Sequence, residues 1–319
     1  MLRILLIFLF IYGCVAVEKH SLDENIEEEI NFNLVHADDF HACVDPFYAD
    51  KSKGEWTLVV IPDTQHYTAN WKKAPFRHME IAFEWIKNMK DPLNIEMVQG
   101  LGDITESWDN DWQWQNGKKA WHKLEGTVAY MPVMGNHDAP YKLNQYFPVS
   151  LFNHHYFWGG DFGGIENNYF LMDIGAEKYM FLHIEPYDEY STYRPEGIKW
   201  AKKMLDKHKN RKAIIATHDN WNTRHIRDQI LKYHSNVVLT NAGHTCAREQ
   251  YYTTTTEWGG LSHNFITDYQ CDSQEIMLLR YYVFKPQEDK VVFYTYSPVT
   301  NEFEWDHDSY GEFYLHQKN

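Results

Sequence analysis

The sequence predicts an α/β fold with two sheets. From residue 56 to about residue 243, short apolar runs alternate with helical stretches, which is typical of βαβ units and a mostly parallel sheet. Beyond Gly243 the helical patterns stop, and a series of apolar runs indicates a second sheet. A chain of 319 residues with 44% hydrophobic and 16% aromatic content can bury a large core, and one compact domain is predicted.

The individual elements follow from local patterns. The run WTLVVI at residues 56–61 predicts a buried strand, and residues 76–89 carry Met79, Phe83 and Ile86 at the spacing of a helix. Further strands are expected at residues 95–101, 129–134, 169–174, 179–184, 212–217 and 237–240, with a helix at 195–208. The later strands are expected at residues 250–257, 262–269, 277–284 and 290–297.

The N-terminal region is expected to lie outside the folded domain. Residues 1–16 form an apolar run with Arg3 at its head and small residues at its end, as in a secretory signal peptide; a membrane anchor and a buried terminal helix are the alternatives. Residues 17–50 are acidic and weakly apolar, which predicts a mobile leader before a domain at residues 51–319. The protein is therefore expected to be secreted or extracytoplasmic, without a stable membrane anchor after cleavage.

The charge and the cysteines limit the partners and the covalent links. The chain has 45 acidic and 30 basic residues and a formal charge of −15, which repels a phosphate backbone, so nucleic acid is not expected as a partner. Cleavage of the signal peptide removes Cys14 and leaves Cys43, Cys246 and Cys271. At most one intramolecular disulfide can then form in an oxidising compartment.

Polar side chains follow the carboxyl ends of five predicted strands. Asp63, Asp103 and Asn136 come after the first three strands along the chain. His218 and His244 come after two later ones. Because the carboxyl ends of parallel strands share one edge of a sheet, these groups are expected to converge. Carboxylate, amide and imidazole donors suit Mn, Fe or Zn, so the sequence predicts a divalent metal site.

Each of these groups also has an ordinary structural explanation. An aspartate after a strand is usually a helix cap, and a Gly-His pair is common in loops. The occurrence of five such groups at strand ends favours the metal site. Glycines precede Asp103, Asn136 and His244, and we expect them to let the backbone turn sharply so that the next side chain enters the site.

Together these motifs resemble the calcineurin-like metallophosphoesterases, whose five blocks run Asp-x-His, Gly-Asp, Gly-Asn-His-Asp/Glu, His and Gly-His-x-His. The resemblance covers residues 57 to about 246, and the block GNHD at residues 135–138 is its most specific part. The opening PDTQ at residues 62–65, with DYQ at 268–270 and TYSP at 295–298, resembles a branch of that superfamily found among secreted proteins. The resemblance implies a four-layer αββα sandwich, in which two mixed β-sheets are flanked by helices.

The resemblance also implies a set of ligands for one or two divalent metal ions. The residues that match the second metal's ligands are Asp103, Asn136, His218 and His244. Asp63 and the bridging Asp103 match ligands of the first metal. Gln65 stands where the family usually has His, and Cys246 stands where Gly-His-x-His has its second His. Since an amide carbonyl is a weak ligand, the first metal is expected to be held loosely or to be absent, unless Cys246 binds as thiolate or His66 turns into the site.

The implied reaction is hydrolysis of a phosphomonoester or phosphodiester by a metal-bound hydroxide, with a phosphate-ester small molecule as the substrate. His137 is expected to protonate the leaving oxygen or to stabilise its charge. Glu106 occupies the position of an acidic residue that orients this histidine in the protein serine/threonine phosphatases of the superfamily; a solvated loop carboxylate is the alternative. The main rival is a catalytically impaired binding protein with this fold, and a nuclease is the second, which the acidic charge disfavours.

Two aromatic segments leave alternatives open. The tryptophans at positions 108, 112, 114 and 121 either pack a helix against the sheet or form a platform for substrate. Residues 146–162, which include His154 and His155, either overhang the site or form a surface flap packed on itself.

Cys246 has three possible roles. Residues 248–257 and 262–270 flank a Trp-Gly-Gly turn and predict an antiparallel hairpin. If the turn is centred between positions 258 and 259, Cys246 and Cys271 face each other at a distance that a disulfide spans. A disulfide to Cys271, metal ligation and a free thiol all remain open.

Overall fold

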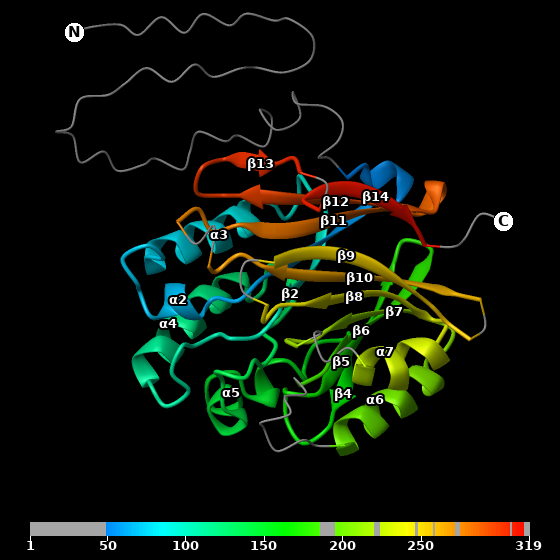
Figure 1. Ribbon diagram of the computed structural model, residues 1–319, viewed down its shortest axis with the longest axis horizontal. Helices are drawn as coiled ribbons and strands as arrows, with labels where there is room; N and C mark the ends of the chain where they lie inside the picture. Colours follow the sequence, from blue (N-terminus) through cyan, green and yellow to red (C-terminus); the bar gives the residue numbers. More distant parts are fainter. Residues whose placement is uncertain are drawn as a thin grey trace, which may run out of the picture.

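The structure is a computed structural model, and it describes residues 49–185, 195–219, 224–245, 248–257, 259–271, 275–306 and 308–315. Two β-sheets pack against each other, and helices cover their outer faces (Figure 1). The predicted signal peptide and nearly all of the predicted leader lie outside the described residues. Both remain predictions.

The described elements are as follows. The helices are α2 (Gln65–Thr68), α3 (Phe76–Met89), α4 (Asp111–Trp121), α5 (Pro140–Tyr146), α6 (Pro195–Lys207) and α7 (Arg224–Gln229). The first sheet holds β1 (Trp56–Ile61), β2 (Ile95–Gly100), β3 (Ala129–Met131), β11 (Leu279–Lys285), β12 (Lys290–Ser297), β13 (Glu302–Glu304) and β14 (Tyr310–Tyr314). The second sheet holds β4 (Trp158–Asp161), β5 (Asn168–Ile174), β6 (Glu177–His183), β7 (Lys212–Ala216), β8 (Val237–Ala242), β9 (Arg248–Thr255) and β10 (Leu261–Asp268).

Both sheets are mixed. The first has the order β13-β12-β11-β1-β2-β3, with β14 paired to β12, and β1, β2 and β3 run parallel. The second has the order β4-β5-β6-β7-β8-β10-β9, and β6, β7, β8 and β10 run parallel. The prediction of two mixed sheets in an α/β fold is confirmed, and the parallel strands form one contiguous block in each sheet. These blocks carry the strand ends that the sequence singled out.

Alternate residues of one strand face two different cores. Along β6, Tyr179 and Phe181 pack between the two sheets. Met180 and Leu182 pack with Ile198 of α6 in a separate core on the outer face. Because successive side chains of a strand point to opposite faces, a strand covered on both sides is apolar throughout. This explains why the parallel strands are uninterrupted apolar runs in the sequence.

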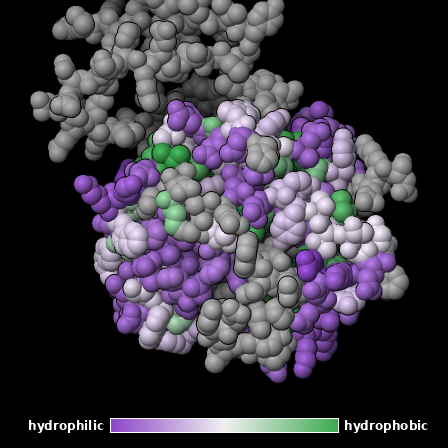
Figure 2. Space-filling view, in the orientation of Figure 1, coloured by the Kyte–Doolittle hydropathy of each residue, from purple (hydrophilic) through white to green (hydrophobic). Residues whose placement is uncertain are grey.

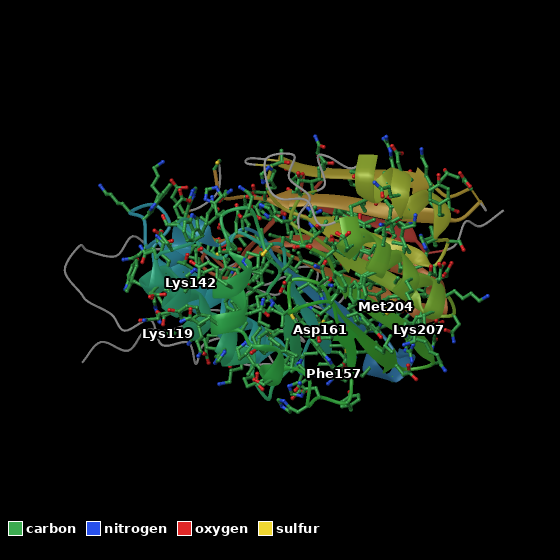
Figure 3. All side chains as sticks on the ribbon, turned by 90° about the horizontal axis from the view of Figure 1, so that it is seen from below. Lys119, Lys142, Phe157, Asp161, Met204 and Lys207 are labelled. Carbon is green, nitrogen blue, oxygen red and sulfur yellow. The ribbon has the colours of Figure 1, made fainter. Side chains whose placement is uncertain are left out.

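Helix α3 covers the first sheet as its apolar spacing predicted. Its Met79, Phe83 and Ile86 are fully buried, and its bounds agree with the prediction. Figure 3 shows the helical layers from another side, with Lys119 of α4 and Lys142 of α5 on one side and Met204 and Lys207 of α6 on the other. The four-layer arrangement follows from these two outer layers.

The described surface is largely polar. In the view of Figure 2, hydrophilic residues predominate and hydrophobic ones form small separate patches. Within the described ranges, the helices are too short and too polar to cross a lipid bilayer.

The predicted hairpin of β9 and β10 is present with a register one residue away from the prediction. Arg248 pairs with Asp268, and Thr255 pairs with Leu261. The loop is closed by a hydrogen bond from Thr256 N to the Gly260 carbonyl, which shifts its centre. The register of the described strands thus differs by one residue from the register that predicted the opposition of positions 246 and 271, and Cys246 lies outside the described residues. Cys271 is disulfide-bonded, and the other three cysteines lie outside the described residues, so the predicted partner stays a prediction.

Candidate metal centre

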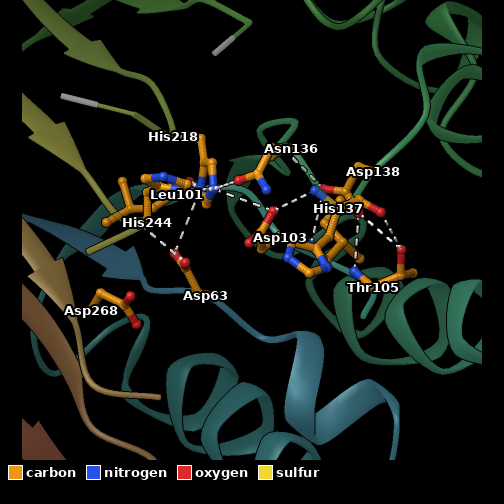
Figure 4. Close-up of polar contacts among 12 residues, drawn as sticks. Asp63, Leu101, Asp103, Thr105, Asn136, His137, Asp138, His218, His244 and Asp268 are labelled. Atoms are coloured by element: carbon orange, nitrogen blue, oxygen red, sulfur yellow. Dashed lines mark hydrogen bonds and ion pairs between the residues drawn. The ribbon is translucent and has the colours of Figure 1, made fainter. Parts of the chain in front are cut away.

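The five predicted strand-end groups converge between the two sheets. Asp63, Asp103 and Asn136 follow β1, β2 and β3 of the first sheet. His218 and His244 follow β7 and β8 of the second sheet. Figure 4 shows all five around one point, although the chain separates the outermost two widely. The convergence arises because the parallel strands of both sheets end at the same side of the sandwich.

His218 lies at the centre of the group. Its Nε2 is 3.2 Å from Asp103 Oδ1, 2.8 Å from Asn136 Oδ1 and 3.1 Å from His244 Nδ1. One ligand atom from each of Asp103, His218 and His244 fits within a span of 4.8 Å. Asn136 and His244 are exposed, so the cluster opens to solvent on this side.

A backbone contact fixes the orientation of the His218 ring. Its Nδ1 lies 2.8 Å from the Leu101 carbonyl oxygen, which can only accept a hydrogen bond. Nδ1 therefore carries a proton, and Nε2 is left to face Asp103 and Asn136. Histidines that bind metals usually donate their second ring N–H in this way, because the contact fixes the tautomer.

The charges of the cluster depend strongly on one another. Burial alone would lower the pKa of His218, but Asp103 and Asp63 outweigh it and raise the pKa to about 10. Burial works to raise the pKa of Asp103 as well, yet the attraction of His218 leaves it lowered. The pKa of Asp63 is raised, first by burial and then by the neighbouring Asp268. The site therefore gathers more negative charge than its own residues neutralise.

Unpaired oxygens show that a cation fits this donor set. Oδ2 of Asp63 accepts a hydrogen bond from His244 N at 3.0 Å, whereas Oδ1 has no hydrogen-bond partner among the described residues and lies 3.8 Å from His218 Nδ1. Oε1 of Gln65 is also buried without such a partner. Buried acceptors without donors are costly, and a divalent cation satisfies several of them together. Carboxylate, amide and imidazole donors suit such ions.

His66 does not extend the ligand cluster. Its Nδ1 lies 3.3 Å from the Gln270 carbonyl oxygen, and its Nε2 lies 3.8 Å from Glu106 Oε2. The ring stacks on Trp71 with centroids 3.8 Å apart. It therefore lines the border of the site with both nitrogens directed at other groups.

His137 is held beside the cluster by backbone groups. Its N–H donates to Asp103 Oδ1 at 2.9 Å, and its ring Nδ1 lies 2.8 Å from the carbonyl oxygen of Glu106. The sequence led us to expect this contact from the Glu106 carboxylate, which instead faces His66. The loop after β2 folds with the Glu106 peptide carbonyl toward His137. The Glu106 side chain therefore points away from His137.

Three residues near the site were not assigned a role from the sequence. Asp138 accepts hydrogen bonds from the N–H groups of Ile104, Thr105 and Gly135, and so ties the loops after β2 and β3 together. Burial, followed by repulsion from Asp103, raises its pKa to about 6. Asp268 and Gln270 lie against Asp63. Asp268 ends a buried strand, but that strand reads LSHNFITD and lacks the apolar run that preceded most of the predicted ligands.

The glycines act mainly by allowing close approach. Gly102 has φ 100°, a left-handed conformation in agreement with the predicted sharp turn. At Gly135 a Cβ atom would lie 2.1 Å from Asp103 Oδ1, and at Gly243 it would lie 2.0 Å from Asp63 Oδ1. The sharp turns also involve Asp103 and His244 themselves, with φ of 45° and 68°. Such strained conformations cost about 1–3 kcal/mol each and are concentrated at functional sites.

Substituting Gly135 by alanine is expected to damage both the site and the fold. The added methyl group overlaps Asp103, and overpacking of this kind typically costs about 1–3 kcal/mol. Gly126→Ala is the control, because Gly126 has φ 70° and no atom within 4 Å of the new methyl group. Only its backbone strain, about 1–2 kcal/mol, is expected. Denaturant unfolding and metal titration of both variants test this; unchanged metal affinity in Gly135→Ala would contradict it.

The aromatic alternatives divide between packing and exposure. Trp114 and Trp121 are buried in α4, whereas Trp108 and Trp112 are about half exposed. Trp108 contacts the exposed Tyr141 with ring centroids 6.4 Å apart. The aromatic loop lies elsewhere: residues around His155 line a cavity of about 250 Å³ with the segment that precedes β3. That segment leads into the amino end of β3, so this part of the loop lies away from the carboxyl ends of the strands that carry the site.

One curated protein resembles the chain in sequence. No family model matches the chain. The chain is 27% identical over 282 residues to YvnB of Bacillus subtilis (strain 168), an uncharacterised protein. The match covers 82% of this chain and 21% of YvnB.

Solved structures resemble it at lower identity. Purple acid phosphatase PPD1 from yellow lupin (Lupinus luteus) seeds superposes with a TM-score of 0.51 and 12% identity, over 85% of this chain and 55% of PPD1. GAP50 of Plasmodium and TT1561 of Thermus thermophilus each give 0.48, at 10% and 11% identity, covering 80% and 76% of this chain and 89% and 99% of theirs. The chain thus spans about a fifth of YvnB and about half of PPD1. It shares the two-sheet fold of PPD1.

Proposed function

We propose that the protein hydrolyses phosphate esters in a metal-dependent reaction. The observation that carries the proposal is the convergence of Asp63, Asp103 and His218, from three strand ends, on one buried cluster with unpaired oxygens. Asn136 and His244 border this cluster on its exposed side. Divalent cations at such a site supply Lewis acidity, which neutralises charge on phosphoryl oxygens and lowers the pKa of water.

The chain's own residues have two tasks in this proposal. Asp103 and His218 belong to the buried wall that orients the donors, and the Leu101 carbonyl keeps the His218 ring from rotating. His137 is half-buried beside Asp103, with Nδ1 held by the Glu106 carbonyl. Its Nε2–H then gives a proton to the leaving oxygen, and the ring is left neutral with its Nδ1–H still on that carbonyl.

A small substrate outside the cytoplasm fits the other observations. The formal charge of −15 disfavours nucleic acid. Trp108, on the loop that carries Glu106, and Tyr141, in the first turn of α5, offer exposed rings for an organic group of the ester. The disulfide bond of Cys271 supports the proposed secretion, because disulfides persist mainly in oxidising compartments. The same proposal includes the expectation that no stable membrane anchor remains after cleavage of the signal peptide.

Metal analysis beside activity tests the proposal. Purified protein is assayed for Mn, Fe and Zn content and for turnover of an aryl phosphate monoester and an aryl phosphate diester. We expect bound metal, turnover of at least one ester, loss of turnover after chelation and recovery on return of the metal.

The rival function is a binding protein with an impaired site, which the replacement of two family histidines at Gln65 and Cys246 favours. Bound metal without turnover of either ester would support this rival. Absence of both metal and turnover would overturn the proposed function.

A further inference from the structure

Strand pairing places Asp268 at the same edge as the predicted ligands. β10 runs parallel to β8, with Ile266 opposite Ala242 at the carboxyl end. Carried two residues further, this register places Asp268 level with His244. Asp268 is fully buried at the end of β10. It is thus a sixth strand-end group beside the five that the sequence predicted.

Asp268 and Asp63 both contact one amide. Nε2 of Gln270 lies 3.4 Å from Asp268 Oδ2 and 3.5 Å from Asp63 Oδ2. The backbone N–H of Gln270 donates to Asp268 Oδ1 at 3.1 Å and fixes that carboxylate. Figure 4 shows the Asp268 carboxylate directed toward Asp63, whose own carboxylate is directed toward His244 and His218. The side-chain amide of Gln270 gives the two carboxylates only long contacts, and a neutral amide does little to offset buried negative charge.

Unsatisfied oxygens surround this pair. Asp63 Oδ1, Gln65 Oε1 and Gln270 Oε1 are all buried without a hydrogen-bond donor among the described residues. Gln65 and Gln270 are at least nine-tenths buried, and the Gln270 amide lies against both carboxylates. Two neighbouring carboxylates with unpaired amide oxygens nearby need a cation. The oxygen-only character of these donors contrasts with the imidazoles of His218 and His244.

We propose that Asp268 is a ligand of the first metal and makes that half of the site an oxygen-donor site for a hard divalent cation, Mn²⁺ or Mg²⁺. This rests on the proposed metal dependence. Asp268 supplies a donor where the family's two histidines, at the positions of Gln65 and Cys246, are missing, and it adds a negative charge that neutral imidazoles do not carry. The two halves of the site then differ: oxygen donors favour hard ions in the first half, and imidazoles favour Zn²⁺ or Fe in the second.

Calorimetric titration of the chelator-treated full chain with Mn²⁺ tests the inference. We expect two binding events in the wild type and at least a tenfold loss of affinity for one of them in Asp268→Asn. That variant keeps the shape and the acceptor for Gln270 N. Paramagnetic resonance of the Mn²⁺-loaded protein is expected to show coupled ions in the wild type and an isolated ion in the variant. Both readouts are independent of turnover.

Two matched variants control the measurement. Asp91→Asn removes an exposed carboxylate, 86% accessible, and is expected to bind as the wild type does. A surface group of Glu125, His154 and His155 also has the make-up of a metal site. All titrations are therefore made in a His154→Gln/His155→Gln background. If Asp268→Asn fails to fold by circular dichroism, Asp268→His decides, since an imidazole in place of the carboxylate is expected to raise the ratio of Zn²⁺ to Mn²⁺ affinity above that of the wild type.

The outcomes separate the inference from the function on which it rests. Unchanged Mn²⁺ affinity in folded Asp268→Asn, whether the wild type binds one ion or two, overturns the role of Asp268 and leaves the metal-dependent function intact. A wild type that binds no divalent ion overturns the proposed function itself. An Asp268→His variant with the wild-type ratio of Zn²⁺ to Mn²⁺ affinity also counts against the ligand role.

Discussion

Replacing Asp103 by asparagine is expected to abolish metal binding at the second site together with phosphate-ester hydrolysis. Asp103 Oδ1 lies 3.2 Å from His218 Nε2 and accepts the N–H of His137, so its carboxylate connects both functional halves of the site. Asparagine is a better test than alanine here, because Asp103 has φ 45° and asparagine tolerates this conformation. Loss of function can then be ascribed to the lost charge. Metal content and turnover of aryl phosphates measure it.

His137→Ala separates binding from chemistry. His137 acts on the leaving group in our proposal, so this variant is expected to keep its metal and to lose about 10²–10⁴-fold in kcat. The loss is expected to be smaller for an ester whose leaving group needs no proton, such as a strongly acidic phenol. Wild-type kcat in His137→Ala would remove the residue from the mechanism. Full metal content in Asp103→Asn would show that Asp103 is not a ligand.

The parts of the site that could be predicted depend on local signals. Asp63, Asp103 and Asn136 each follow an apolar run whose local pattern is enough to predict a strand. Their position at a common edge then follows from the parallel pairing of the strands. Helix α3 was predicted to its end residues because its apolar spacing covers fourteen consecutive positions. Where sequence pattern and long-range packing agree, the prediction holds without knowledge of the partner strands.

Asp268 shows where such a prediction ends. Its strand was expected at residues 262–269, but the hairpin signal with the preceding strand suggested antiparallel neighbours only. The parallel pairing of β10 with β8 is a contact between segments joined through β9, and no local pattern encodes it. The predicted set of strand-end groups therefore ended at His244 and did not include Asp268. The residue type at this position could be taken from the sequence, but the order of the strands in the sheet could not.

Backbone contacts were beyond prediction for a different reason. The Glu106 carbonyl holds His137, and any residue at that position has a carbonyl group, so the residue type carries no signal. The hairpin register failed similarly, because a shift of one residue depends on how the turn closes at Thr256. The short helices α2 and α5 have too few residues for a periodic pattern.

A buried ion pair connects the two sheets near the site. Arg280 of β11 is fully buried and forms a salt bridge with Glu249 of β9, in the other sheet. Its guanidinium also donates to Thr295 Oγ1 at 3.0 Å. Tyr269 lies between Asp268 and Gln270 in the chain, and its hydroxyl donates a hydrogen bond to Glu249 Oε1 at 2.6 Å. The network thus anchors the strand end that carries Asp268.

Arg280→Met is expected to lower the free energy of unfolding by about 3–5 kcal/mol, because it leaves the Glu249 carboxylate without its partner. Methionine fills much of the same volume, so the loss reflects the charge more than a cavity. Metal affinity at the first site is expected to fall as well. Arg280 no longer holds Glu249 in place, and Glu249 accepts the hydrogen bond from the Tyr269 hydroxyl. Urea unfolding with linear extrapolation measures the stability, and calorimetric titration with Mn²⁺ measures the affinity.

Two comparisons decide whether the unpaired charge is the cause. The double variant Arg280→Met/Glu249→Gln removes the charge as well and is expected to recover most of the lost stability, as apolar or neutral replacements of buried pairs often do. Lys212→Met breaks the pair of Lys212 with Glu177, which joins neighbouring strands near the surface, and is expected to cost at most about 1 kcal/mol. If Arg280→Met costs no more than Lys212→Met, the inter-sheet pair does not stabilise the fold. If the double variant is as unstable as Arg280→Met, lost packing on Phe265 and Phe293, each 5.2 Å from the guanidinium, is the cause instead.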